Sequence, residues 1–131
     1  MTKYDDNFQP PAPFARVALR NIDSGERVRD VPMLLDTGAE ISLLPKSFIE
    51  KLGVSVLIDE SVLLEGFNNS KSMAEVVSLQ IVFLGRRFAG KFCLIEQDYG
   101  ILGRDILNHV SLLFDGLSLS WKEVDDSQVI N

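Results

Sequence analysis

The sequence predicts a mostly β fold with one or two short helices, and three observations lead to this class. Runs of β-branched and aromatic residues recur along the chain and are separated by turn residues such as Asn68-Asn69-Ser70 and Asp115-Gly116. Only two short stretches, residues 46–52 and 104–110, show the apolar spacing of a helix. With 131 residues, of which 46% are hydrophobic and 24% charged, the chain suits a single globular domain.

The first half of the chain is predicted to contain an arm, strands, a turn and one helix. Residues 1–13 are polar and contain several prolines, which predicts a mobile N-terminal arm. Residues 14–22 alternate with the period of a strand, and Asp23-Ser24-Gly25 is expected to form a turn before the apolar run 31–35. A short helix is expected over residues 46–52 because a proline precedes it and a glycine follows it.

The second half is predicted to alternate strands with turns. Its β-rich segments are residues 54–58, 61–67, 71–84 and 87–95. A second helical turn is expected after Gly103, and two β-rich runs flank Asp115-Gly116, which is a strong hairpin signal. Residues 122–131 are polar and are expected to form a C-terminal tail, so the folded domain would span residues 14–121.

Net charge and residue counts narrow the class of function. The chain has a net charge of −6, a pI near 4.7 and no Lys/Arg cluster, which argues against binding to nucleic acid or to an anionic membrane. One cysteine and one histidine, Cys93 and His109, argue against an internal disulfide and against a zinc site built from Cys and His alone. There is no secretory signal and no apolar run near the ~20 residues that a membrane span needs, so a cytoplasmic location is the default expectation.

The residues that carry chemistry lie in two short segments far apart in the chain. Leu34-Leu35-Asp36-Thr37-Gly38-Ala39 runs from apolar strand residues into an aspartate, so its carboxylate would emerge at the end of a strand. Thr37 offers a hydroxyl, and Gly38 allows a tight turn, while nearby backbone N–H groups could hold the carboxylate in place. The second segment, Ile101-Leu102-Gly103-Arg104-Asp105, contains a glycine at which a strand could pass close to another backbone.

Together the two segments resemble the motifs of the retropepsin-like aspartic proteases, and the resemblance covers residues 14–121. It implies an all-β acid protease fold, which is a closed barrel or sandwich with a ψ-shaped loop, a flap hairpin and one or two short helices. Asp36 is the implied catalytic residue, in an active-site loop with Thr37, Gly38 and Ala39. Peptide hydrolysis by this family needs neither a metal nor an organic cofactor.

The resemblance also implies residues for structural support and for substrate contact. Glu40 and Arg104 match an acidic residue and an arginine that pair to brace the active-site loop, and Gly103 matches the glycine of the segment behind it. The flap falls in the hairpin over residues 63–71, where Gly66, Phe67 and Asn68 are the substrate-contacting residues. Solvated surface charges and an ordinary exposed hairpin are the structural alternatives.

A single catalytic aspartate per chain has a mechanistic consequence. Hydrolysis by this route needs two close carboxylates that share one proton, one acting as base on water and the other polarising the peptide carbonyl. Asp23 is a poor second carboxylate because Arg20-Asn21 and Glu26-Arg27 make its surroundings polar. We therefore expect a symmetric homodimer in which the two Asp36 side chains meet.

Two features outside these segments have more than one explanation. Leu117, Leu119 and Trp121 stand at two-residue spacing, which predicts a final strand that buries one face. A dimer interface and core packing explain that spacing equally well. A nucleophilic Cys93–His109 dyad is conceivable, but Cys93 lies in an apolar strand and is expected to be a buried structural thiol.

The predicted function is that of an aspartic endopeptidase that acts as a homodimer on a protein or peptide substrate. Ala39 lacks a hydroxyl that could bond to an ionised carboxylate, which predicts an activity optimum that is mildly rather than strongly acidic. Two alternatives stay open, because a fold does not fix a function. One is a non-proteolytic retropepsin-fold module that dimerises and binds peptides, and the other is a dimerisation or processing domain of a larger polyprotein.

Overall fold

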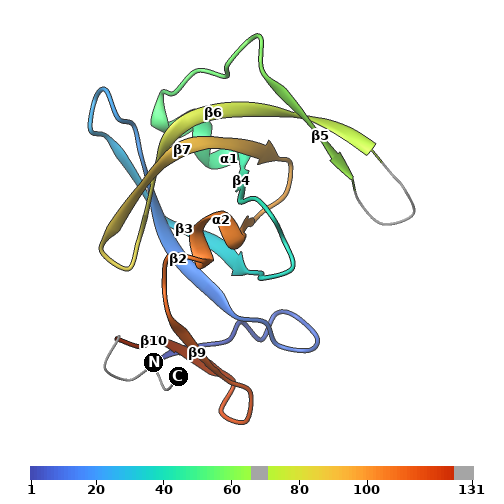
Figure 1. Ribbon diagram of the computed structural model, residues 1–131, viewed down its shortest axis with the longest axis vertical. Helices are drawn as coiled ribbons and strands as arrows, with labels where there is room; N and C mark the ends of the chain where they lie inside the picture. The colour runs from blue at the N-terminus through green and yellow to red at the C-terminus, as the bar shows by residue number, and fades with distance from the viewer. Residues whose placement is uncertain (66–70, 126–131) are drawn as a thin grey trace.

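The computed structural model describes residues 1–65 and 71–125, and its strands form a closed barrel beside a small terminal sheet (Figure 1). The barrel strands are β2 (Phe14–Arg20), β3 (Arg27–Leu35), β4 (Leu43–Pro45), β5 (Ser61–Glu65), β6 (Lys71–Phe83), β7 (Arg86–Ile95) and β8 (Gly100–Leu102). They pair in the order β2-β3-β8-β4-β7-β6-β5, and a further pairing of β2 with β6 closes the barrel. The predicted all-β fold class is confirmed.

The core of the barrel consists of strand side chains that alternate with outward-facing ones along each strand. In β3, Val31, Met33 and Leu35 are buried while the residues between them are partly exposed, which is the two-residue period of a strand with one face inward. β2 contributes Val17 and Leu19 to the same core. Burial of apolar area at roughly 25 cal/mol per Å² is the main force that holds these strands in register.

The centre of the sheet has a ψ-shaped arrangement made by β8. This strand lies between β3 and β4, parallel to β3 with Leu34 opposite Ile101, and antiparallel to β4 with Leu43 opposite Ile101. A side chain at Gly100 would collide with the Met33 side chain and the Leu43 carbonyl oxygen, so the crossing requires a glycine there. The ψ-loop expected from the sequence is therefore present.

The helices are short and lie at the positions that the sequence predicts. α1 (Lys46–Ile49) begins after Pro45 and continues as the 3-10 helix η1 (Glu50–Leu52), which ends at Gly53 with φ of 72°. α2 (Arg104–Leu107) follows Gly103 directly. In the described part of the chain no helix has the length and apolar character needed to cross a membrane.

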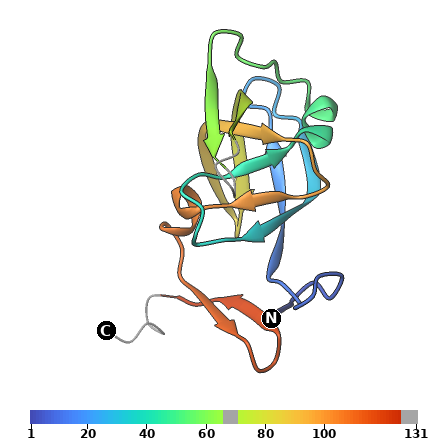
Figure 2. The same cartoon turned by 90° about the vertical axis from the view of Figure 1, so that its right-hand side faces the viewer.

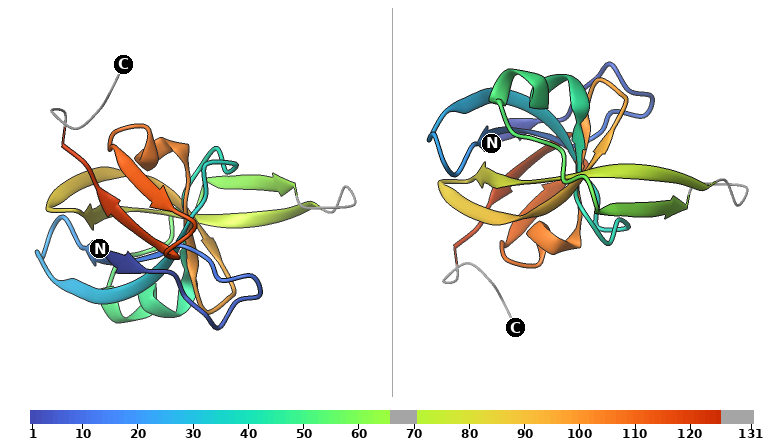
Figure 3. Two further views of the ribbon diagram at one scale, coloured as in Figure 1. Left: turned by 90° about the horizontal axis from the view of Figure 1, so that it is seen from below. Right: turned by 90° about the horizontal axis from the view of Figure 1, so that it is seen from above.

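β5 and the first half of β6 form a hairpin that projects from the barrel (Figures 1 and 3). Its register runs from Ser61 opposite Glu75 to Glu65 opposite Lys71. The sequence predicts a flap in this hairpin. The residues expected to contact substrate, Gly66, Phe67 and Asn68, lie outside the described residues.

The N-terminal residues, which the sequence predicts to be a mobile arm, pair in the structure with the end of the chain. β1 (Thr2–Lys3) is antiparallel to β10 (Ser120–Glu123), which also pairs with β9 (Leu112–Asp115), and Figure 2 shows this three-stranded sheet apart from the barrel. Asp5 and Ala12 then form a β-bridge that folds the connecting segment back on itself. Backbone pairing over more than a hundred residues of separation leaves no signal in a short polar sequence, so the arrangement was not predictable.

The C-terminal hairpin forms as predicted, but its turn is longer than the sequence indicates. Residues 116–119 make the turn, so Leu117 is fully exposed and Leu119 is 44% exposed, and neither buries a strand face with Trp121. The Asp115 carboxylate accepts hydrogen bonds from the backbone N–H groups of Leu117 and Ser118. Hydrogen bonds from the Ser118 side chain and backbone hold the pKa of Asp115 below its usual value.

Candidate active site

The candidate site is the loop of residues 36–42, which β3 delivers at its C-terminal end. The backbone N–H of Leu35 donates to the Pro13 carbonyl oxygen at 3.0 Å, and that of Asp36 donates to the Leu102 carbonyl oxygen at 3.0 Å. These bonds fix the end of β3 between the segment that precedes β2 and the ψ strand β8. Asp36 itself is partly exposed, so its carboxylate stands at the boundary between the core and solvent.

The loop holds the Asp36 carboxylate with its own backbone. The Gly38 N–H donates to Asp36 Oδ1 at 2.9 Å, and the Ala39 N–H donates to the Asp36 carbonyl oxygen at 3.2 Å. A Cβ atom at Gly38 would lie 3.1 Å from Asp36 Oδ1, which is tighter than an ordinary contact. The glycine therefore lets the turn bring a donor close to the carboxylate, as the sequence predicts.

Gly103 marks the close approach that the sequence predicts for the second segment. A Cβ atom there would lie 2.7 Å from the carbonyl carbon and oxygen of Ile41 and 2.9 Å from the Ala39 carbonyl oxygen. These are backbone atoms of the active-site loop and cannot move aside as a flexible side chain could. The ψ strand and the loop can therefore lie this close only with glycine at position 103.

Arg104 supports the loop, but through a different partner from the one expected. Its guanidinium Nη1 donates to the Thr37 carbonyl oxygen at 2.7 Å, and its backbone N–H donates to the Ala39 carbonyl oxygen at 2.8 Å. Glu40 is exposed and forms no ion pair with Arg104 in residues 1–65 and 71–125. The guanidinium and the backbone N–H of Arg104 each bind one carbonyl oxygen of the loop, without the predicted carboxylate partner.

Sequence reasoning assigned no role to Ser42 and Asp105, which the structure brings together. The Ser42 backbone N–H donates to Asp105 Oδ2 at 3.0 Å, and its hydroxyl donates to Asp105 Oδ1 at 2.6 Å. A serine inside the apolar run from Ile41 to Leu44 was the available signal, since a buried hydroxyl needs a partner.

Asp23-Ser24-Gly25 is an ordinary turn, as predicted. It joins β2 to β3, and the Asn21 side-chain oxygen accepts hydrogen bonds from the N–H groups of Asp23 and Ser24. Gly25 has a φ of 75°, a conformation that favours glycine. Asp23 is exposed, and in the described part of the chain no strand lies behind its turn as β8 lies behind the Asp36 loop. Of these two aspartates, only Asp36 follows a strand that pairs with β8.

The Cys93–His109 dyad finds no support in the geometry. Cys93 is 5% exposed in β7 and packs with Ala74 and Val76, while the His109 ring lies against Phe88 with 6.1 Å between ring centroids. Burial, and secondarily the negative charge of Asp105, raises the pKa of the Cys93 thiol. A nucleophilic cysteine needs the opposite shift, so Cys93 is a structural thiol.

One cavity of about 470 Å³ adjoins the active-site loop at Ile41 and Ser42. Its other apolar lining residues are Val62, Val76 and Cys93. Its polar lining residues include Asp59, Glu60, Ser61 and Lys91. The Lys91 ammonium lies 2.6 Å from Glu60 Oε1, which joins β7 to the residue before β5.

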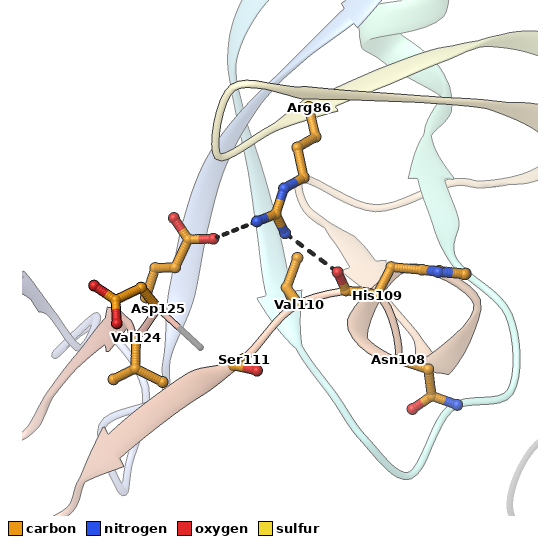
Figure 4. A pocket seen from close by; sticks show the side chains of 8 residues that line it. Arg86, Asn108, His109, Val110, Ser111, Val124 and Asp125 are labelled. Carbon is orange, nitrogen blue, oxygen red and sulfur yellow. Dashed lines mark hydrogen bonds and ion pairs between the residues drawn. The ribbon is translucent and has the colours of Figure 1, made fainter. Parts of the chain in front are cut away.

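Another pocket, of about 670 Å³, lies away from Asp36, between the barrel and the terminal sheet (Figure 4). Arg86 spans it, donating to the His109 carbonyl oxygen at 3.2 Å and pairing with Glu123 Oε2 at 3.4 Å. Asn108, Ser111 and Asp125 complete a polar lining. Its volume alone does not make this pocket the active site, because neither Asp36 nor any other residue of the 36–42 loop is among its lining residues.

Comparisons with known proteins agree with this geometry. Residues 26–109, more than half of the chain, match a family described as "gag-polyprotein putative aspartyl protease". Among solved structures, the chain is similar to EIAV protease complexed with the inhibitor HBY-793, with a TM-score of 0.56 and 22% sequence identity. That match covers 75% of this chain and 86% of the other, and at this identity it shows the fold. A comparison with curated proteins gives no significant match.

Proposed function

Because the chain belongs to the retropepsin-like family of gag-polyprotein aspartyl proteases, we propose that it is an aspartic endopeptidase that acts as a homodimer. The observation that carries this proposal is the setting of Asp36. Its backbone is fixed to the ψ strand through Leu102, and its carboxylate is held by Gly38 yet partly open to solvent. A positioned carboxylate that water can reach is what a general base requires.

The reaction uses two such carboxylates, one from each protomer. One Asp36 is ionised and takes a proton from water, whose oxygen attacks the peptide carbonyl carbon. The other is protonated and polarises the carbonyl oxygen. It then donates its proton to the leaving nitrogen as the C–N bond breaks, so the pair still holds one proton. Two carboxylates a few Å apart do not ionise together, so the pair titrates as a unit and activity has a bell-shaped pH profile.

A second copy of the chain is required because each chain contributes one carboxylate of this kind. Asp23, the only other aspartate in an Asp-Ser/Thr-Gly triplet, lies in an exposed turn. A two-fold axis brings identical surfaces together and places the two Asp36 side chains opposite each other.

The substrate is an extended peptide that lies between the active-site loop and the β5–β6 hairpin. Such a peptide pairs with strand edges through its backbone and presents alternate side chains to pockets. The cavity beside Ile41 takes one of these side chains, and its apolar lining residues Val62 and Val76 favour an aliphatic group of moderate size.

Cleavage of a peptide library from pH 3 to pH 8 tests the proposal, with Asp36→Asn as the variant and Asp23→Asn as the matched control. Cleavage with a bell-shaped pH profile that is lost in Asp36→Asn and kept in Asp23→Asn supports it. Cleavage that persists in Asp36→Asn contradicts the catalytic assignment. Peptide binding without cleavage by the parent protein supports the non-proteolytic module instead.

The dimer is tested by size exclusion at several protein concentrations together with activity. We expect specific activity to fall on dilution as the dimer dissociates, because each half of the site is inactive alone. A protein that stays monomeric at every concentration and still cleaves peptides would contradict the shared pair of carboxylates.

A further inference from the structure

Ser42 is buried in an unusual setting for a polar side chain. It is 1% exposed and lies at the end of the active-site loop, immediately before β4. Its hydroxyl both donates to Asp105 Oδ1 at 2.6 Å and accepts the backbone N–H of Gly103 at 3.0 Å. Its own backbone N–H donates to the second carboxylate oxygen of Asp105 at 3.0 Å. Both oxygens of one carboxylate are therefore committed to one residue of the loop.

These contacts belong to a row of three consecutive residues that all bind the loop. The Gly103 N–H donates to the Ser42 hydroxyl oxygen, and the Arg104 N–H donates to the Ala39 carbonyl oxygen. The Asp105 carboxylate accepts from Ser42. The residue before the row, Leu102, accepts the N–H of Asp36. The loop is thus attached to one short segment at its first residue and at its last.

The two ends of the loop are held by different kinds of bond. At the Asp36 end the bond joins two neutral backbone groups, while at the Ser42 end a carboxylate accepts a hydroxyl and an N–H. Hydrogen bonds to a carboxylate are shorter and stronger than those between neutral groups. Asp105 is itself exposed, but the Ser42 groups that donate to it are buried. The Ser42 end thus adds two bonds to a carboxylate, while near the Asp36 end the Arg104 guanidinium donates to the Thr37 carbonyl oxygen.

We infer that Ser42 and Asp105 are positioning residues for Asp36, which they hold at the geometry needed for catalysis without touching the reacting atoms. The inference rests on the proposed function of Asp36. Removal of the Ser42 hydroxyl frees one oxygen of Asp105 and leaves the buried Gly103 N–H without its acceptor. The loop then gains freedom over residues 36–42, and small displacements of a reacting group have large effects on rate.

Three variants test this. Ser42→Ala removes the hydroxyl, and Asp105→Asn removes the charge and one acceptor. Ser42→Thr keeps the hydroxyl at a position that lines the cavity of about 470 Å³. Ser47→Ala and Asp98→Asn are matched controls, because both side chains are exposed and lie outside the loop. Amide hydrogen exchange and peptide cleavage kinetics are measured on each.

We expect the amides of Asp36 and Arg104 to exchange at least about tenfold faster in Ser42→Ala and Asp105→Asn, while amides of β6 and β7 keep their rates. We also expect kcat to fall about tenfold or more with KM changed less than about threefold, because the substrate pocket survives while the orientation of Asp36 does not. Ser42→Thr should restore both quantities to near the parent values, and both controls should match the parent.

Three results would overturn the inference. The first is unchanged exchange at Asp36 and Arg104 in both loss variants. The second is an equal acceleration over the whole barrel, which would mean a general loss of stability. The third is faster exchange in the loop with an unchanged kcat. A parent protein without peptidase activity contradicts the proposed function separately, because the exchange pattern is measured without any substrate.

Discussion

The indole N–H of Trp121 donates a hydrogen bond to the Phe14 carbonyl oxygen at 3.0 Å, across 107 residues of sequence. Trp121 is only 4% exposed, and its ring lies 6.3 Å from that of Phe83 between centroids. One side chain of the terminal sheet is thereby inserted into the barrel. Together with the Arg86–Glu123 ion pair, this residue links that sheet to the barrel.

Trp121→Phe should lower the free energy of unfolding by about 1–3 kcal/mol, because the buried Phe14 carbonyl loses its donor while most of the ring contact is kept. Urea denaturation followed by circular dichroism measures the change. Leu117→Ala in the neighbouring turn is the control, since Leu117 is fully exposed, and it should change stability by less than about 0.5 kcal/mol. Equal effects of the two substitutions would contradict the role of Trp121.

Phe8→Ala should also destabilise the protein, although Phe8 lies in the segment that the sequence predicts to be mobile. The Phe8 ring stacks on Phe14 at 4.8 Å and meets the edge of Tyr99 at 5.3 Å, so it joins the N-terminal segment to the start of β2 and to the bend before β8. Loss of such aromatic contacts costs about 1 kcal/mol, or roughly 4 °C in melting temperature. Asn7→Ala is the neighbouring control, and an unchanged melting temperature in Phe8→Ala would show that the segment is not held by its rings.

Gly103→Ala should lower the free energy of unfolding by about 1–3 kcal/mol or more and reduce peptidase activity, because the added Cβ meets the Ile41 backbone at 2.7 Å. Gly116→Ala is a matched control, since nothing lies within 4 Å of a Cβ atom there. Chemical denaturation and cleavage assays on both variants test the close approach. Parent-like behaviour of Gly103→Ala would mean that the ψ strand and the loop are less tightly apposed.

Cys93 should make stability fall at alkaline pH. Burial raises the pKa of its thiol above the ordinary value of 9.0, so above that pH the unfolded chain loses its proton before the native protein does. The unfolded state is favoured there, and the free energy of unfolding decreases as pH rises. Comparison of stability from pH 8 to pH 10.5 in the parent and in Cys93→Ala measures this, and we expect a shallower slope in the variant.

The activity optimum is expected to be mildly acidic, because Ala39 offers no hydroxyl to an ionised carboxylate. Ala39→Ser should move the optimum to lower pH, since a serine hydroxyl can donate to the charged form. Cleavage rates over pH 3 to pH 8 for both proteins test the prediction. A parent optimum near pH 2, or an optimum in Ala39→Ser above that of the parent, would contradict it.

The parts of the site that the sequence predicted are those that backbone geometry dictates. Gly38 and Gly103 stand where a side chain would meet other atoms at 3.1 Å and 2.7 Å, and an apolar strand leads into Asp36. Requirements of this kind appear in the sequence as glycines and as a two-residue period.

The parts that were not predicted depend on which side chains meet across the fold. Arg104 was expected to pair with Glu40 but contacts the Thr37 carbonyl oxygen, and Ser42 meets Asp105 across 63 residues. Every residue has a backbone carbonyl, so the sequence does not indicate which carbonyl oxygen a guanidinium will bind. The pairing of β1 with β10 escaped prediction for the same reason, since backbone bonds alone make it.

The contact between Thr37 and Arg104 spans 67 residues, which affects the order in which the chain folds during its synthesis. During synthesis, Asp36 leaves the ribosome long before the segment that must lie behind it exists. Closing a loop of this length lowers the conformational entropy of the chain before native contacts can compensate. The parallel pairing of β3 with β8 is therefore expected late in folding. A chain interrupted before residue 103 would carry Asp36 without the segment whose backbone and side chains hold its loop.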